Sequence, residues 1–89
     1  MMKVISYGNR KSDQILWDAS TPELEAAAHL ALFRYLKEYG VYEASPPNKK
    51  EKPFFEKALN GDAHAAGLLL SLRKQYEYEE WDLLSVKTP

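Results

Sequence analysis

Two short runs of β-branched and aromatic residues lie near the start of the chain, at residues 3–7 and 14–18. They flank a polar segment, residues 8–13, that is rich in turn-forming residues. Runs of this kind are typical of strands, so we expect a β-hairpin over residues 3–18. The connection is longer than the two-residue turns that fix strand register, and the sequence therefore leaves the pairing of the strands open.

Residues 22–39 carry the clearest helical pattern in the chain. Ser20 and Thr21 are competing N-caps, because Ser20 begins a capping box and Thr21 precedes a proline suited to the first helical turn. Gly40 supplies the left-handed residue that commonly closes a helix. With the period of an α-helix, one broad apolar stripe results, composed of Leu24, Ala28, Ala31, Leu32, Tyr35, Leu36 and Tyr39.

Leu30 and Phe33 are apolar residues that lie off this stripe. A helix that is apolar over more than half of its circumference either lies between two layers of its own chain or uses its second side for a partner. The second option predicts a homodimer, because an isologous interface would bury Leu30 and Phe33 from both copies. Under the first option, a second layer of the same chain covers these two residues.

Adjacent prolines and several lysines mark residues 43–53 as an exposed loop. A short helix is expected next, over residues 53–59, and Asp62 is the expected N-cap of a further helix that begins at Ala63. Small residues at positions 65–67 would allow another element to approach this helix closely. Its apolar stripe consists of Ala65, Leu68, Leu69, Leu72 and Tyr76, with Leu70 outside it.

Residues 77–86 are ambiguous, because glutamates favour a helix while alternating aromatic and acidic residues, followed by leucine and valine, suit a strand. We expect a final strand at residues 81–86, which gives the order ββααβ. The predicted fold is α+β and a single domain over residues 1–89. Two main helices and one short helix pack on one face of a small three-stranded antiparallel sheet. The alternative is a mostly helical chain with an N-terminal hairpin.

The composition narrows the class of protein without indicating an activity. The chain is 45% hydrophobic and 28% charged, with a net charge of −1, which is an ordinary globular ratio. It contains no cysteine, so disulfides, thiolate nucleophiles and thiolate-bound metals are excluded. No uncharged run approaches the roughly 18 apolar residues of a membrane span, and no basic stretch leads into an apolar N-terminal segment. We therefore expect a cytoplasmic protein that makes no contact with membranes.

Signatures of catalysis are missing from the sequence. No serine stands in a Gly-x-Ser-x-Gly elbow, and the four glycines are isolated from one another, so they form no phosphate-binding loop. Glu79, Glu80 and Asp82 offer a pair of carboxylates, but adjacent acids on a short segment more often solvate the edge of a sheet. We expect a protein that is not an enzyme and carries no cofactor.

Glu25 and His29 are four residues apart, so their side chains share one face of a helix. With Asp62 and His64 they form the best potential metal-binding set, which defines an alternative function, a metal-dependent activity at Glu25, His29 and His64. The histidines lack the close spacing of zinc motifs. The simpler interpretation is that Glu25 complements a helix N-terminus and Asp62 caps a helix, with no metal bound.

Residues 49–57 support a second alternative, the binding of single-stranded nucleic acid. Four lysines flank two phenylalanines that could stack on bases. Two glutamates reduce the charge of this segment to +2, and the net charge of −1 gives no long-range attraction to phosphates, which argues against this partner. In the simpler interpretation the phenylalanines anchor the short helix in the core. The candidate nucleic-acid contacts are Lys49, Lys50, Lys52 and Phe54.

Aromatic residues are the feature that most favours a specific function. They make up 12% of the chain, and tyrosine and tryptophan are enriched at interface hot spots. The leading hypothesis is an intracellular, non-enzymatic interaction or regulatory module that binds a protein partner, of the small accessory type that bacteria and their phages encode. In the competing interpretation these aromatics point inward from an amphipathic edge. The predicted surface combines apolar anchors with negative charge and consists of Tyr78, Trp81, Glu77, Glu79 and Glu80.

Overall fold

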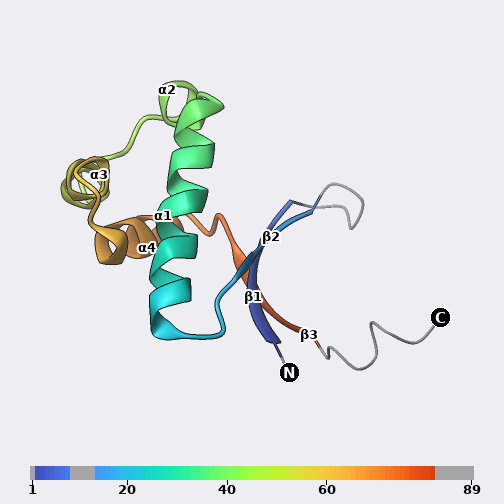
Figure 1. The fold of residues 1–89 in the computed structure, drawn as a ribbon. Helices are drawn as coiled ribbons and strands as arrows, with labels where there is room; N and C mark the ends of the chain where they lie inside the picture. Colours follow the sequence, from blue (N-terminus) through green and yellow to red (C-terminus); the bar gives the residue numbers. More distant parts are fainter. Residues whose placement is uncertain (1, 9–13, 82–89) are drawn as a thin grey trace.

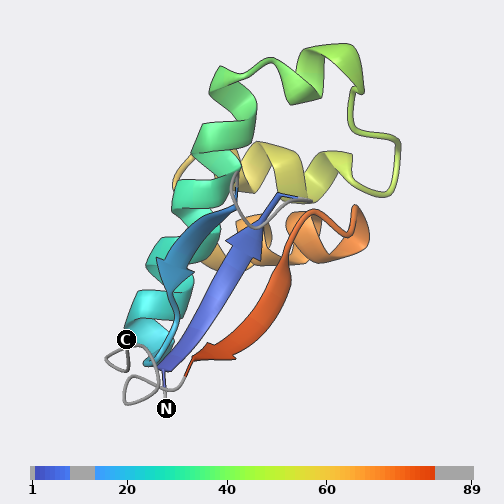
Figure 2. The same cartoon turned by 90° about the vertical axis from the view of Figure 1, so that its right-hand side faces the viewer.

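A three-stranded antiparallel sheet forms one side of the molecule in the computed structural model, which describes residues 2–8 and 14–81. β1 (Met2–Tyr7) is the central strand, with β2 (Ile15–Asp18) on one edge and β3 (Glu77–Trp81) on the other (Figure 2). Both outer strands run antiparallel to β1. The expected hairpin is therefore confirmed, and the structure supplies the register that the sequence left open.

All the helices of the described chain lie on one side of this sheet (Figure 1). They are α1 (Pro22–Glu38), α2 (Val41–Ala44), α3 (Lys52–Leu59) and α4 (Ala63–Leu72). The predicted α+β class is confirmed, and the mostly helical alternative is wrong. α2 is a single turn that the sequence pattern did not indicate. Within the described ranges, none of the helices combines the length and hydropathy needed to cross a bilayer.

The helix boundaries follow local capping chemistry. The Thr21 hydroxyl accepts a hydrogen bond of 3.1 Å from an amide in the first turn of α1, so Thr21 is its N-cap. Ser20 instead donates its hydroxyl proton to the Asp18 carboxylate at 2.6 Å. Gly40, at φ 77°, turns the chain from α1 into α2, and Asp62 caps α4 through a hydrogen bond of 3.1 Å. Local sequence therefore determines where these helices begin and end.

α1 is packed on two sides. The Tyr35 ring lies 6.0 Å from the ring of Tyr7 in β1, so this side of α1 faces the sheet. The Phe33 ring lies 5.4 Å from Tyr42 in α2 and 5.8 Å from Phe55 in α3, so this side faces the other helices. α1 therefore lies between two layers of its own chain, which is the first of the two options that its sequence allowed.

The residues predicted to mediate self-association have a different role. Phe33 is only 1% exposed, and Leu30 is partly buried against the same core. The assignment of Phe33 to a dimer surface is therefore corrected, because the second helical layer covers it, while Leu30 is only partly available to a partner. Leu24 and Tyr39 are exposed although they belong to the predicted stripe, because they lie in the terminal turns of α1 where its neighbours no longer cover it.

The buried face of α4 differs from the predicted stripe. Leu70, which the pattern left out, is fully buried, whereas Leu68 and Leu72 are exposed. α4 is short and apolar almost all round, so periodicity cannot select one face. Its burial is decided instead by contacts with α1 and α3, which both pack against it. The residues that these contacts bury are Ala65, Ala66, Gly67, Leu69 and Leu70.

The connection between α2 and α3 lies within the loop expected at residues 43–53. Most of its side chains are exposed, but a single guanidinium ties it to α4. Arg73, at the end of α4, donates to the carbonyl and hydroxyl oxygens of Ser45 at 2.7 and 2.6 Å. The same side chain lies 3.6 Å from the Glu51 carboxylate. Arg73 therefore holds both ends of the segment between the two helices.

β3 follows α4 after a tight reversal of the chain. Lys74 adopts a left-handed conformation with φ 51°, and the strand begins at Glu77. The final strand was expected at residues 81–86, so it begins four residues earlier than the pattern indicated, and residues 82–86 lie outside the described residues. This early start places Tyr78 opposite Ile5 of the central strand.

Substitutions of Leu70 and Leu72 can test which side of α4 is buried. Leu70→Ala should reduce the free energy of unfolding by about 2 to 5 kcal/mol, because it leaves a cavity in a packed core. Leu72→Ala, at a side chain that is 54% exposed, should cost less than about 1 kcal/mol. Denaturant titration of both variants measures the difference, and equal losses would show that α4 is rotated relative to this description.

Candidate functional site

Three hollows in the surface adjoin one another around Tyr76. Their volumes are about 490, 370 and 160 Å³, and Tyr76 lines each of them. This residue was expected on the buried stripe of the preceding helix, but it lies in the short link between α4 and β3 and is half-buried. We refer to the three hollows and the residues that line them as the Tyr76 surface.

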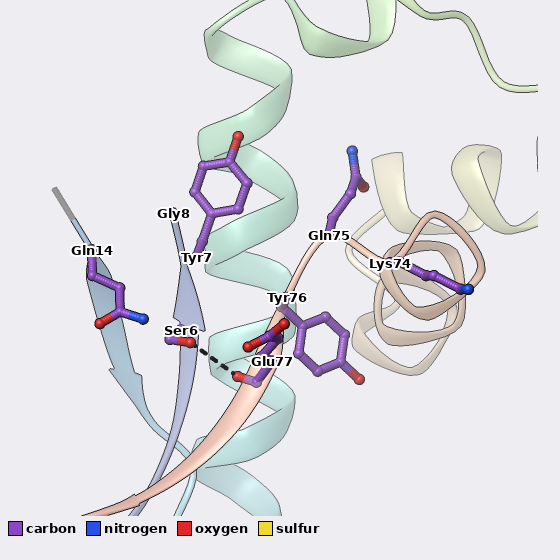
Figure 3. A pocket seen from close by; sticks show the side chains of 8 residues that line it. All are labelled: Ser6, Tyr7, Gly8, Gln14, Lys74, Gln75, Tyr76 and Glu77. Carbon is purple, nitrogen blue, oxygen red and sulfur yellow. Dashed lines mark hydrogen bonds between the residues drawn. The ribbon is translucent and has the colours of Figure 1, made fainter. Parts of the chain in front are cut away.

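The largest hollow lies where β1 and β3 separate (Figure 3). Ser6 is paired with Glu77 in the ladder, and its hydroxyl donates to the Glu77 carbonyl at 3.4 Å. Beyond this pair the ladder between β1 and β3 ends, and the two chains diverge. Gln14 and Lys74 stand on opposite sides of the opening. Most of its lining is polar and consists of Ser6, Tyr7, Gly8, Gln14, Lys74, Gln75, Tyr76 and Glu77.

The two smaller hollows continue this surface onto the helices. The hollow of 370 Å³ lies between the end of α4 and the start of β3, and the hollow of 160 Å³ lies between α1 and α4. Ser71 and Tyr76 line both, so the hollows are neighbours. The smaller hollow is also lined by His29, His64, Gly67 and Leu68. Leu68 and Leu72, one turn apart, add exposed apolar area to this side of α4.

A chain of polar contacts crosses the Tyr76 surface. The Ser71 and Tyr76 hydroxyls are 2.9 Å apart, and Tyr76 donates to the Tyr78 hydroxyl at 3.5 Å. The Tyr78 hydroxyl lies 3.4 Å from Nε2 of His29 and also hydrogen bonds to the Glu25 carboxylate. Side chains from α4, β3 and α1 are thereby linked, so the position of Tyr78 depends on how these three elements pack.

The environment keeps these groups in defined protonation states. Burial, together with the hydrogen bonds to Tyr76 and Glu25, raises the pKa of Tyr78, so its phenol stays protonated. The hydrogen bond from Lys3, at 3.1 Å, lowers the pKa of Glu25, and Tyr78 contributes to the same shift. Burial lowers the pKa of His29, an effect that the Glu25 carboxylate partly offsets. The surface therefore presents a neutral phenol and a neutral imidazole at pH 7.

The five residues predicted to bind a partner fall on two faces of the sheet. Tyr78 points toward the helices, because its hydroxyl reaches α1. By the alternation of side chains along a strand, Glu80 lies on the same face, whereas Glu77 and Glu79 lie on the opposite one. The backbone of Trp81 ends β3, but its side chain lies outside the described residues. Only Tyr78, which is 46% exposed, lines the Tyr76 surface from the helical face.

The residues proposed to contact nucleic acid are only partly available. Lys49, Lys50 and Lys52 are exposed. Phe54 is partly buried against the hydrophobic core, and Phe55 packs edge-on against a core phenylalanine at 5.8 Å. The lysines therefore stand without the stacking platform that the sequence suggested, because both phenylalanines anchor α3.

The potential metal ligands do not converge. His29 and His64 line the same hollow, but the Glu25 carboxylate is paired with Lys3. Among the residues that the structure describes, no group of three or more His, Cys, Asp or Glu side chains is arranged to hold a metal ion. The described residues therefore give no support to the alternative of a metal-dependent activity at Glu25, His29 and His64, and Asp62 caps α4.

Comparisons of the chain with family models, curated proteins and solved structures find no match. The candidate site therefore rests on geometry. Sequence reasoning missed Ser71, Lys74 and Gln75, because isolated polar residues near a helix end form no motif. The available signal was the spacing of Tyr76 and Tyr78, which is typical of one face of a strand and placed two rings side by side at 5.2 Å.

The close approach of α1 and α4 can be tested at Gly67. A Cβ added there would lie 2.6 Å from Nδ1 of His29, so Gly67→Ala should destabilise the protein by about 1 to 3 kcal/mol. The same change in an unobstructed helix would stabilise it by about 1 kcal/mol. In a His29→Ala background the loss should shrink or reverse, as measured by denaturant unfolding of all four proteins. If the changes in unfolding free energy caused by Gly67→Ala and His29→Ala were additive, the contact between these two residues would be contradicted.

The lowered pKa of His29 predicts a dependence of stability on pH. Below its ordinary pKa of 6.5, the unfolded chain takes up a proton at this site more readily than the folded chain, so the free energy of unfolding should fall as the pH decreases from 7.5 to 5. His29→Gln should remove this component, whereas His64→Gln, at an exposed side chain, should retain it. Unfolding curves across this range provide the measurement. An unchanged slope in His29→Gln would assign the dependence to other groups.

Proposed function

We propose that this protein is a non-enzymatic, intracellular interaction module that binds a protein partner through the Tyr76 surface. The observation that carries the proposal is the convergence of three hollows on one tyrosine, beside the exposed ring of Tyr78. Binding hot spots typically combine aromatic anchors with pockets that exclude water around them. The partner role predicted for Tyr78 is retained in this proposal, while the hollows and the exposed leucines of α4 enlarge the surface.

The chemistry of the surface supports recognition. Tyr78 has a protonated phenol that is already oriented by His29 and Glu25, so little side-chain entropy remains to be lost when a partner binds. Its ring also lies under the Lys3 ammonium, 4.3 Å from the ring centroid. Leu68 and Leu72 supply apolar area at the same side of α4. A preformed aromatic anchor with an apolar border suits a protein partner.

A second exposed aromatic provides a matched comparison. Tyr39 is 72% exposed and stacks on Tyr35 at 4.6 Å, at the other end of α1 from Glu25. It lines none of the three hollows described above. Exposure alone would therefore favour Tyr39, whereas the combination of exposure with hollows favours Tyr78.

The test compares Tyr78→Ser with Tyr39→Ser in affinity capture from a lysate of the source organism. Proteins captured by the wild type should be lost with Tyr78→Ser and retained with Tyr39→Ser. With the purified partner, Tyr78→Ser should raise the dissociation constant by about 30-fold, which corresponds to the loss of about 2 kcal/mol of binding free energy at a hot spot. Thermal melts should show both variants folded. Retention of the partner by a folded Tyr78→Ser variant, or its loss with Tyr39→Ser alone, would place the binding surface elsewhere.

A further inference from the structure

In the part of the chain that the structure describes, β3 is an edge strand of the sheet. β3 is hydrogen bonded to β1 along one edge only, and within the described residues no strand pairs with the other. An edge of this kind presents backbone N–H and C=O groups that can accept an added strand. The hollow of 370 Å³ adjoins it, since residues of α4, the α4–β3 link and β3 line this hollow and none of β1 does. Both main-chain groups and a recess for side chains are therefore present together.

We propose that the Tyr76 surface recognises its partner as an extended basic segment, which adds to the free edge of β3 as a further strand. This inference rests on the proposed function and names the mode of recognition. In such pairing, main-chain hydrogen bonds supply much of the affinity, while alternate side chains of the added strand supply specificity. The register of β3 then determines which side chains of the added strand meet which residues.

The faces of β3 define the pattern of the added segment. Residues opposite Glu77 and Glu79 would lie on the face away from the helices, where basic side chains are favoured. Two carboxylates lie there, and that of Glu79 also accepts a hydrogen bond of 3.0 Å from Gln14. The residue between them would lie opposite Tyr78, on the face that adjoins the hollows, where an apolar or aromatic side chain fits. Glu80 adds negative charge at the end of the strand. The expected motif is basic, apolar, basic over three consecutive residues.

The same charges disfavour a second copy of β3 as the occupant. In an antiparallel pair of two β3 strands, every register that pairs four or more residues places at least one glutamate directly opposite another, because three of the five residues are glutamates. Like charges in directly opposed positions destabilise a pair of strands. The charge of β3 therefore selects against self-pairing and for a basic strand from another protein.

The test uses a displayed library of random nine-residue peptides, selected against the full-length protein. Selected sequences should be enriched in the motif of two basic residues around an apolar one. For the best sequence made as a free peptide, N-methylation of alternate amides on the pairing edge should weaken binding by about tenfold or more, because main-chain hydrogen bonds are lost. Hydrogen exchange of the amides of residues 77–81 should slow on binding, whereas those of β2, the other edge strand, should not.

A matched pair of charge variants completes the design. Glu77→Gln combined with Glu79→Gln should weaken the binding of the peptide and reduce its salt dependence, because these two carboxylates lie opposite the basic residues. Glu38→Gln with Glu43→Gln, at exposed sites on α1 and α2, should do neither. Equal binding of the N-methylated peptide, or protection on β2, would overturn strand addition. If Tyr78→Ser still abolishes capture of the partner in that case, the proposed function stands and only the mode of recognition fails. If Tyr78→Ser retains the partner, the proposed function fails as well.

Discussion

The packing of α1 between the sheet and the other helices is the constraint on which the rest of the structure depends. A helix of 17 residues that contacts β1 through Tyr35 and the helical layer through Phe33 leaves only a narrow strip for solvent. Each layer alone would expose a large apolar area of α1, so neither layer is stable without the other. A short chain gains a continuous core by this arrangement, because one helix contributes to both of its halves.

The Tyr76 surface is a consequence of that packing. Gly67 allows the imidazole of His29 to lie against α4, and this contact sets how closely α4 approaches α1. The chain must then reverse within a few residues to enter β3, which it does at Lys74. Because the reversal is tight, Tyr76 lies outside both α4 and β3 and is not paired with another strand. The surrounding space is not filled, and hollows remain around its side chain. The surface therefore arises where a helix and a strand are joined by a link too short to fill the space between them.

The ends of the helices could be predicted from the sequence, because they depend on local capping residues. The side of a helix that is buried could not, because it depends on which other elements pack against the helix. Thr21, Gly40 and Asp62 act within a few residues of their own positions, so their capping and turning roles follow from the sequence. The burial of Leu70 and the exposure of Leu72 depend on where α1 and α3 contact an almost wholly apolar helix. Periodicity contains no information about those contacts.

Of the residues that the sequence assigned to partner binding, Tyr78 and Glu77 line the candidate site. Tyr78 was recognised as an anchor because it alternates with acidic residues, and it is exposed in the structure. The hollows around Tyr76 depend on the separation of β1 from β3 and on the end of α4, which are distant in sequence. Phe33 shows the opposite case. Its position off the apolar stripe suggested a partner surface, but Tyr42 and Phe55, which lies 22 positions further along the chain, bury it.

Arg73 gives the loop between α2 and α3 an unusual tolerance of change. Its guanidinium holds Ser45 at one end of the segment and Glu51 at the other. Asn48 forms a turn with Glu51 at the start of α3, because the Asn48 side chain accepts from the Glu51 amide at 2.9 Å and the Glu51 carboxylate accepts from the Asn48 amide at 3.0 Å. Only the two prolines between Ser45 and Asn48 lie outside these anchored ends. Insertions between Ser45 and Asn48 should therefore be accommodated as an outward extension of the loop, whereas insertions at Lys49 or Lys50 would break the turn that precedes α3. Arg73 is also the direct neighbour of Lys74, which borders the Tyr76 surface. The loop is thereby tied to the border of the candidate binding surface, so a fusion tag inserted in it would stand close to that surface and is better placed elsewhere.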